Sequence, residues 1–151
     1  MNKRKTALTL LTVVAALGLV SSVLEPVFSP KSKGRSPGRG AVRTVGVGIY
    51  GDSNLTDALS SINWGMIDPG VSQNYTCYIR NEGNSASVLG LSTINWNPIK
   101  ASAFIGLSWD YAGKFLLPSE VINVTFMLSV SPNVSGVSNF SFDTVISSSN
   151  A

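Results

Sequence analysis

Apolar and polar residues alternate in short runs from residue 41 onward, and this period of two constrains the fold more than any other feature of the sequence. The clearest run is 122–130, where large apolar residues at the even positions alternate mainly with polar ones. Residues 75–79 and 140–146 repeat the pattern. Successive side chains of a strand point to opposite faces of a sheet, so each run predicts a strand with one face on a core. No run after residue 41 has capped helical periodicity, and the sequence therefore predicts an all-β domain over 41–151.

Turn signals separate these runs and set the expected number of strands. Asp68-Pro69-Gly70 suits a type II turn, because proline fixes the first φ and glycine accepts a positive one. Asn81-Glu82-Gly83-Asn84 predicts a hairpin loop, and Ala112-Gly113 predicts a tight connection. Further strands are predicted at 44–50, 58–64, 87–93, 104–109 and 114–117. The expected fold is a single immunoglobulin-like β-sandwich of about seven or eight strands.

A hydrophobic segment precedes this domain. Residues 1–5 (MNKRK) are basic, and residues 6–24 contain no charged side chain. As a helix this segment is about 28 Å long, enough to cross the hydrocarbon core of a bilayer. It predicts a retained transmembrane anchor or, given the small residues Ser21 and Ser22 near its end, a cleaved signal peptide. A prepilin-type leader cut near Ala7 is a third alternative, for which the usual cleavage context is missing.

Residues 25–40 read as a linker between the hydrophobic segment and the domain. They hold three prolines and three glycines among serine, lysine and arginine. Proline removes backbone donors, glycine is costly to order and like charges repel, so the sequence predicts a disordered spacer. The alternative is a polybasic tether that docks on anionic lipid. Its candidate contact residues are Lys31, Lys33, Arg35, Arg39 and Arg43.

The charges divide sharply along the chain. Eight of the eleven basic residues fall in the first 43 positions, where Glu25 is the only acidic residue, giving +7. Residues 44–151 carry three basic and seven acidic residues, giving −4. An acidic domain on a basic leader argues against a nucleic-acid partner and favours a membrane surface. The basic start before the apolar run predicts an extracytoplasmic domain at the membrane or cell surface, although the later basic residues oppose that orientation.

The residue inventory argues against catalysis. The chain has no histidine, which removes the commonest general base and metal ligand. Cys77 is the only cysteine, so no intrachain disulfide or thiolate cluster forms, and its place in a strand pattern predicts a small inward-facing side chain. Residues 51–57 faintly resemble a calcium loop but lack its glycine and closing glutamate. The sequence therefore predicts a non-enzymatic protein without metal or cofactor.

Two other residue sets bear on binding. The tryptophans Trp64, Trp96 and Trp109 suit the core of a sandwich better than a carbohydrate platform. Five N-x-[ST] sequons, which a serine-rich chain also produces by chance, are predicted N-glycosylation acceptors if the domain is exported. Their asparagines are Asn54, Asn74, Asn123, Asn133 and Asn139.

Three motifs carry a family resemblance. Ile62-Asn63-Trp64-Gly65, Asp68-Pro69-Gly70 and the run 78–84 (YIRNEGN) resemble the W-G…P-G…N-x-G-N layout of immunoglobulin-like β-sandwich domains of surface proteins. Segments 95–98 (NWNP) and 107–111 (LSWDY) are similar to those of archaeal exported or membrane-anchored sandwiches. This resemblance speaks to fold, and implies a cell-envelope protein with a structural or adhesive role.

Some proteins of that architecture build surface filaments by donating an N-terminal strand to the next subunit. The resemblance therefore implies an alternative, a secreted pilin-like subunit that assembles by donor-strand complementation. Residues 44–50 (TVGVGIY) could be the donor, but they serve equally well as the first strand of their own domain. Residues 23–28 are a poor donor because Pro26 interrupts them.

Overall fold

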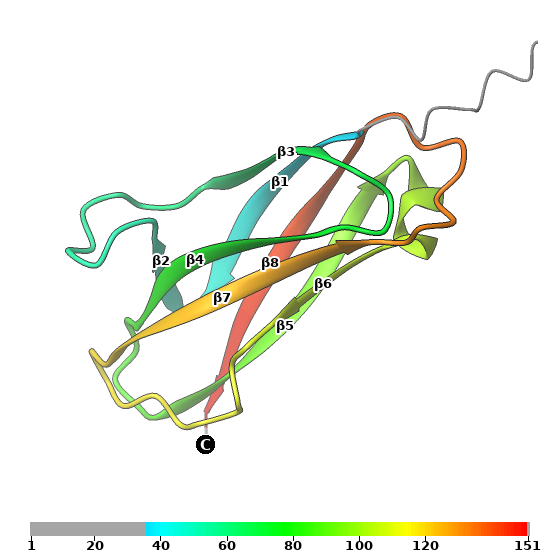
Figure 1. Ribbon diagram of the computed structural model, residues 1–151. Helices are drawn as coiled ribbons and strands as arrows, with labels where there is room; N and C mark the ends of the chain where they lie inside the picture. Colours follow the sequence, from blue (N-terminus) through cyan, green and yellow to red (C-terminus); the bar gives the residue numbers. More distant parts are fainter. Residues whose placement is uncertain (1–35, 151) are drawn as a thin grey trace, which may run out of the picture. The chain divides into compact units, whose positions relative to one another are not determined.

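The computed structural model describes residues 36–150, which form two four-stranded sheets packed face to face (Figure 1). The prediction of an all-β sandwich is confirmed. The predicted basic start at 1–5, the hydrophobic segment at 6–24 and linker residues 25–35 lie outside the described residues. The strands are β1 Ser36–Val45, β2 Val47–Tyr50, β3 Ser61–Ile67, β4 Ser72–Asn81, β5 Ser87–Asn97, β6 Ile105–Trp109, β7 Val121–Val130 and β8 Phe140–Asn150, with a 3-10 helix, η1, at Ile99–Ala103.

The first sheet, sheet A, has the strand order β3-β1-β8-β5, and the second, sheet B, has the order β2-β4-β7-β6. β1 runs antiparallel to β3 and parallel to β8, so the first strand lies in the interior of sheet A. The chain crosses to sheet B at Gly46, whose φ of 78° bends the backbone between β1 and β2. The strand predicted at 44–50 is therefore wrong as one element, because this bend divides it.

Residues 36–40, which the sequence assigned to a disordered linker, form the first half of β1. The inward positions Gly38 and Gly40 are buried, and the rings of two β8 phenylalanines fill the space that side chains would need. A Cβ atom at Gly38 would lie 2.4 Å from Cζ of Phe140, and one at Gly40 would lie 3.2 Å from the carbonyl oxygen of Phe142. The linker prediction is wrong for residues 36–40 because inward-facing glycines give a strand no alternation of apolar and polar residues.

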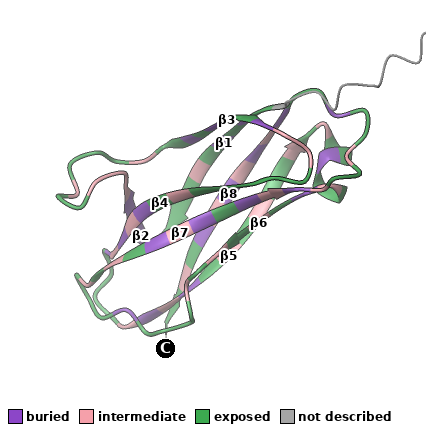
Figure 2. Cartoon of the chain, in the orientation of Figure 1, coloured by how far each residue is buried: buried purple, intermediate pink, exposed green. Residues whose placement is uncertain are grey.

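The core lies between the two sheets and follows the predicted alternation. Buried residues alternate with exposed or half-buried ones along most of β7 in Figure 2. Cys77 and Ile79 on β4 are fully buried as predicted. The three tryptophans also belong to the core: Trp64 is 1% exposed, and the other two pack against the buried cluster. Trp96 stacks on Phe142 at 4.3 Å between ring centroids, which confirms packing over a surface platform.

The turn predictions have mixed outcomes. Gly70 has a φ of 79° and the Val71 N–H donates to the Asp68 carbonyl at 3.2 Å, which confirms the turn between β3 and β4. The predicted hairpin at 81–84 is wrong, because β4 and β5 belong to different sheets and this loop crosses between them. Residues 114–117 form no strand, and Leu116 makes only an isolated bridge to Ser87. Ala112-Gly113 lies within the longer connection from β6 to β7 rather than a tight turn.

Candidate functional site

The five predicted glycosylation acceptors are all exposed and occupy three parts of the domain. Asn74 on β4 and Asn123 on β7 share the outward face of sheet B. Asn133 and Asn139 lie in the connection between β7 and β8, and Asn54 lies in the loop between β2 and β3. The structure therefore leaves each acceptor accessible but brings only Asn74 and Asn123 onto one face. Glycosylation itself stays a prediction.

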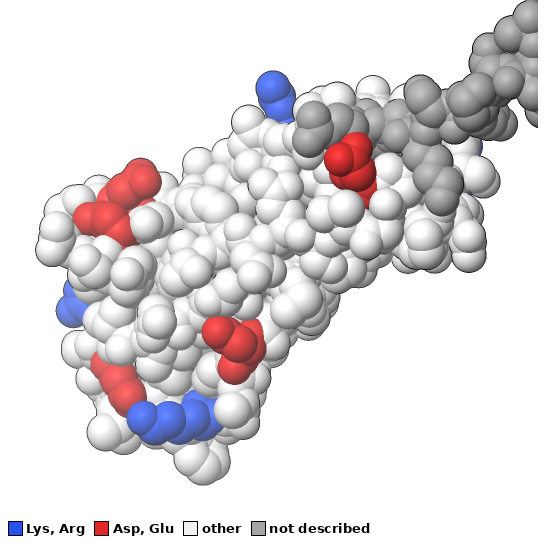
Figure 3. Space-filling model, in the orientation of Figure 1, with Lys and Arg blue, Asp and Glu red and all other residues white. Residues whose placement is uncertain are grey.

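The outward face of sheet B is polar but largely uncharged. In Figure 3 the middle of this face, over β4 and β7, carries no lysine, arginine, aspartate or glutamate side chain. Hydroxyl pairs cross the two strands instead: Ser72 and Ser129 lie 2.8 Å apart, and Thr76 and Thr125 lie 3.3 Å apart. This face offers hydrogen bonds without charge.

The outward face of sheet A carries the basic residues of β1. Arg43 donates from Nε to Oδ2 of Asp143 on β8 at 2.7 Å, and Asn95 on β5 donates to the same oxygen at 2.8 Å. The bond from Asn95, followed by that from Arg43, holds the pKa of Asp143 below its ordinary value. The Arg39 side chain is exposed and makes no hydrogen bond or ion pair with any residue in the described range 36–150. Of the five predicted lipid contacts, Lys31, Lys33 and Arg35 lie outside the described residues.

The loop at 51–57 is organised by its own hydrogen bonds. Both the N–H and the Oγ1–H of Thr56 donate to the Asp52 carboxylate, at 2.9 Å and 2.7 Å, and the N–H of Asp57 donates to it at 2.8 Å. These bonds, the one from Asp57 foremost, lower the pKa of Asp52. The Asp52 carboxylate, the first acidic group of the calcium-loop pattern, therefore accepts hydrogen bonds within its own polar loop.

The acidic side chains and Cys77 of the described residues form no group that could hold a metal ion. No three aspartate, glutamate, cysteine or histidine side chains converge within residues 36–150. Burial raises the pKa of the Cys77 thiol to about 12, with a smaller contribution from the charge of Asp110, so the thiol stays protonated. A buried protonated thiol is a packing group rather than a nucleophile.

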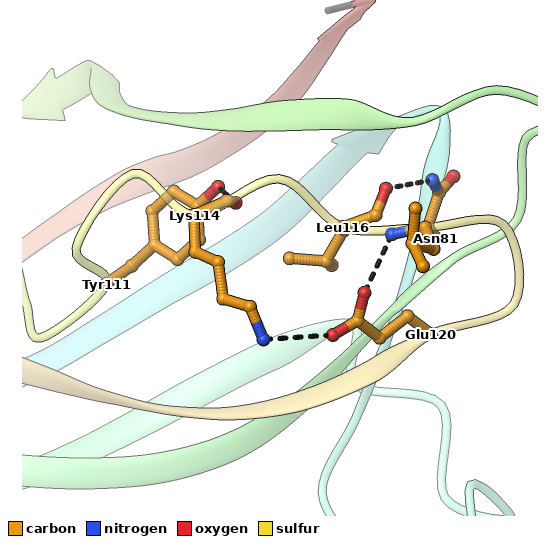
Figure 4. Close-up of polar contacts among 6 residues, drawn as sticks. Asn81, Tyr111, Lys114, Leu116 and Glu120 are labelled. Atoms are coloured by element: carbon orange, nitrogen blue, oxygen red, sulfur yellow. Dashed lines mark hydrogen bonds and ion pairs between the residues drawn. The ribbon is translucent and has the colours of Figure 1, made fainter.

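Sequence reasoning missed a polar network around the buried side chain of Asn81, at the end of the sandwich where β4 finishes (Figure 4). Asn81 is 1% exposed, and its Nδ2 donates to the carbonyls of Ser85 and Leu116 at 2.9 Å and 3.0 Å. Its Oδ1 accepts from the Gly83 N–H at 2.9 Å. Glu120 accepts from the Leu117 N–H at 2.7 Å and from Lys114 at 3.4 Å. The Asn-Glu-Gly-Asn motif located the end of β4, although the hairpin predicted from it was wrong, and it gave no sign that Asn81 anchors the 114–120 loop.

The central position of β1 is the second feature that the sequence did not reveal. β1 pairs with β3 through residues 36–41 and with β8 through residues 38–45, so it holds the two strands together. Its inward residues are two glycines and the half-buried Val42. Backbone pairing and the fit of glycine under aromatic rings therefore secure this strand more than burial of its own side chains.

Comparisons with known proteins add no relative: no protein-family model matches the chain, and no curated protein is similar to it. Within residues 36–150 no helix is long and apolar enough to span a bilayer.

Proposed function

We propose that this chain is a non-enzymatic cell-envelope protein, in which residues 6–24 anchor an extracytoplasmic β-sandwich with a structural or adhesive role. The observation that carries the proposal is the pairing of an uncharged N-terminal segment with a sandwich whose five sequon asparagines are all exposed. The outward face of sheet B, polar and largely uncharged, suits contact with other envelope components. Residues 25–35 are the spacer, and their basic residues favour an anionic lipid surface.

We also classify the sandwich as immunoglobulin-like. Support comes from its size and from its two four-stranded sheets. One feature departs from the usual arrangement: immunoglobulin domains place their first strand at a sheet edge, whereas β1 lies between β3 and β8.

Surface labelling of whole cells tests the location of the domain. The wild-type chain is the background control, because its only cysteine, Cys77, is buried and its pKa is about 12. Ser108→Cys on β6 places an exposed thiol on the outward face of sheet B. A membrane-impermeant maleimide should label Ser108→Cys in intact cells and leave the wild type unlabelled. Labelling only after lysis would contradict an extracytoplasmic domain.

A second candidate function, a surface filament subunit that assembles by strand donation, is favoured by β1 specifically. This strand is the first of the described chain, lies inside sheet A and connects to the rest of the domain through Gly46. Because β1 contributes few side chains to the core, the same strand from another copy would make the same backbone bonds with β3 and β8. Exchange would then link subunits without new contacts.

Engineered disulfides separate the two candidates. Ala41 on β1 faces Ser61 on β3, so Ala41→Cys with Ser61→Cys should form a disulfide. If β1 stays in its own chain, the product runs as a monomer on a non-reducing gel, and if β1 is exchanged it forms a covalent ladder. Ser72→Cys with Ser129→Cys is the matched control, because both strands lie in sheet B and the bond is intrachain in either case.

A further inference from the structure

Four polar side chains form a row across the outward face of sheet A. Arg39 on β1 lies in register with Asn63 on β3 and with Ser141 on β8, and Ser141 lies in register with Asn97 on β5. Each of the four strands thus contributes one group: an amide, a guanidinium, a hydroxyl and a second amide. No charged partner in the described range neutralises Arg39.

Depressions lie on both sides of this row. One, of about 530 Å³, includes Ala41, Ser61 and Asp143 in its lining. The other, of about 400 Å³, includes Pro37, Asn97 and Asn139. Arg39 and Ser141 line both. Arg39 and Ser141 therefore lie between the two hollows, and we call the pair of hollows with these two residues the sheet A groove.

The hydrogen bonds that the groove residues make within the protein leave specific donors and acceptors available for a ligand. Oδ1 of Asn63 accepts from the Gly65 N–H at 3.0 Å, which leaves its NH2 group as a donor toward the groove. Both bonds to Asp143 fall on Oδ2, so Oδ1 keeps its capacity to accept. Arg39 retains all five of its N–H donors with respect to the described residues.

We propose that this groove binds an acidic saccharide chain. A carboxylate can pair with both arms of the Arg39 guanidinium, a bidentate contact stronger than a neutral hydrogen bond. Hydroxyl groups both donate and accept, and so match Asn63, Ser141 and Oδ1 of Asp143. The Asp143 carboxylate repels densely charged anions, which favours a ligand with one negative charge per sugar. The open shape suits an extended chain rather than an enclosed small molecule.

Calorimetric titration of the full-length chain in detergent micelles tests the proposal. The protein should carry no glycan, so that no sugar on Asn139 covers the groove. Trigalacturonate should bind saturably. Neutral trigalactose lacks the carboxylate that pairs with Arg39, and acetate lacks the sugar hydroxyl groups, so both should bind far more weakly. Arg39→Gln should weaken trigalacturonate binding at least about tenfold. Arg80→Gln on sheet B removes the same charge and should leave the affinity unchanged.

A second pair of variants fills space without changing charge. Ala41→Trp should abolish trigalacturonate binding because the indole occupies the larger hollow, whereas Ser108→Trp on sheet B should have no effect. Undiminished binding by either Arg39→Gln or Ala41→Trp would overturn the proposal, as would the absence of binding to the wild type. Equal affinity for acetate would reduce the groove to a simple carboxylate contact and overturn the saccharide assignment. None of these outcomes depends on the proposed cellular location.

Discussion

The two sheets of the sandwich fill a shared core by different means. Sheet A brings aromatic rings, notably Trp64, Phe140 and Phe142, over a strand that has glycines at two of its inward positions. Sheet B brings mainly aliphatic side chains and a buried cysteine around Phe126. Outward, sheet A carries both arginines of β1 and Asp143, whereas the middle of sheet B is uncharged. The stability of sheet A therefore depends on the close fit of β1 under the aromatic rings. The stability of sheet B depends on the burial of apolar side chains from its own strands.

The largest expected difference between the sheets is in their tolerance of a larger residue at a glycine. Gly38→Val should lower the free energy of unfolding by about 3 kcal/mol, because its Cβ would collide with the Phe140 ring. Gly106 on β6 has no heavy atom within 4 Å of a built Cβ, so Gly106→Val should change stability by less than about 0.5 kcal/mol. Chemical denaturation measures both. Equal effects would contradict the special fit of β1.

A polar group placed in the inner face of sheet B should be the next most damaging change. Cys77 is fully buried, so Cys77→Ser should cost about 2 kcal/mol by burying a hydroxyl that has no partner. Cys77→Ala is the control and should cost less, since it introduces no polar atom. Denaturant titration of the two variants decides the point. A serine variant as stable as the alanine variant would mean that this face tolerates polarity.

In sheet A, removing a buried polar group is expected to raise the stability rather than lower it. Thr144 on β8 is 1% exposed, and its hydroxyl has no hydrogen-bond partner among residues 36–150. Thr144→Val keeps the shape and removes this buried polar atom, so it should raise the free energy of unfolding by about 1 kcal/mol. Exposed Thr76 on sheet B supplies the control, because Thr76→Val removes a hydroxyl that already has a neighbour at 3.3 Å. A destabilised Thr144→Val would show that the hydroxyl is satisfied.

The smallest expected difference between the sheets is in how stability changes with pH in the acid range. The pKa of Asp143 is lowered in the folded chain from an ordinary value of 3.8, so its stabilisation is present above that pH and is lost as the pH falls further. Asp143→Asn should therefore lower the melting temperature slightly at pH 7 and flatten the decline of the melting temperature as the pH falls below about 4. The remaining decline reflects groups such as Asp52 and Glu120, whose pKa values are also lowered. An unchanged acid profile would remove Asp143 from the account of sheet A.

The contrast between the sheets also explains what the sequence could predict. The alternation in 75–79, 122–130 and 140–146 identified parts of β4, β7 and β8 with the correct inward residues, because these strands bury their own side chains. The first half of β1 was missed because its inward glycines, at positions 38 and 40, have no hydrophobic period. The rings of Phe140 and Phe142 on β8, about a hundred residues later in the chain, fill the space beside these glycines.

Features that depend on strand register could not be predicted from the sequence either. The row of Asn63, Arg39, Ser141 and Asn97 joins four strands that are distant in sequence. The 81–84 turn was recognised from its residue types, but whether it joins neighbours or crosses between sheets depends on the topology. By contrast, the sequon asparagines were identified directly, because each motif is local.

The most direct test of the proposed function is the intact mass of the chain extracted from native membranes. The account predicts a membrane-bound chain whose mass includes residues 6–24, with added mass at the exposed sequon asparagines if they are glycosylated. A chain shortened past residue 24 and recovered in sheared surface assemblies would contradict the anchored protein and leave strand donation as the better account.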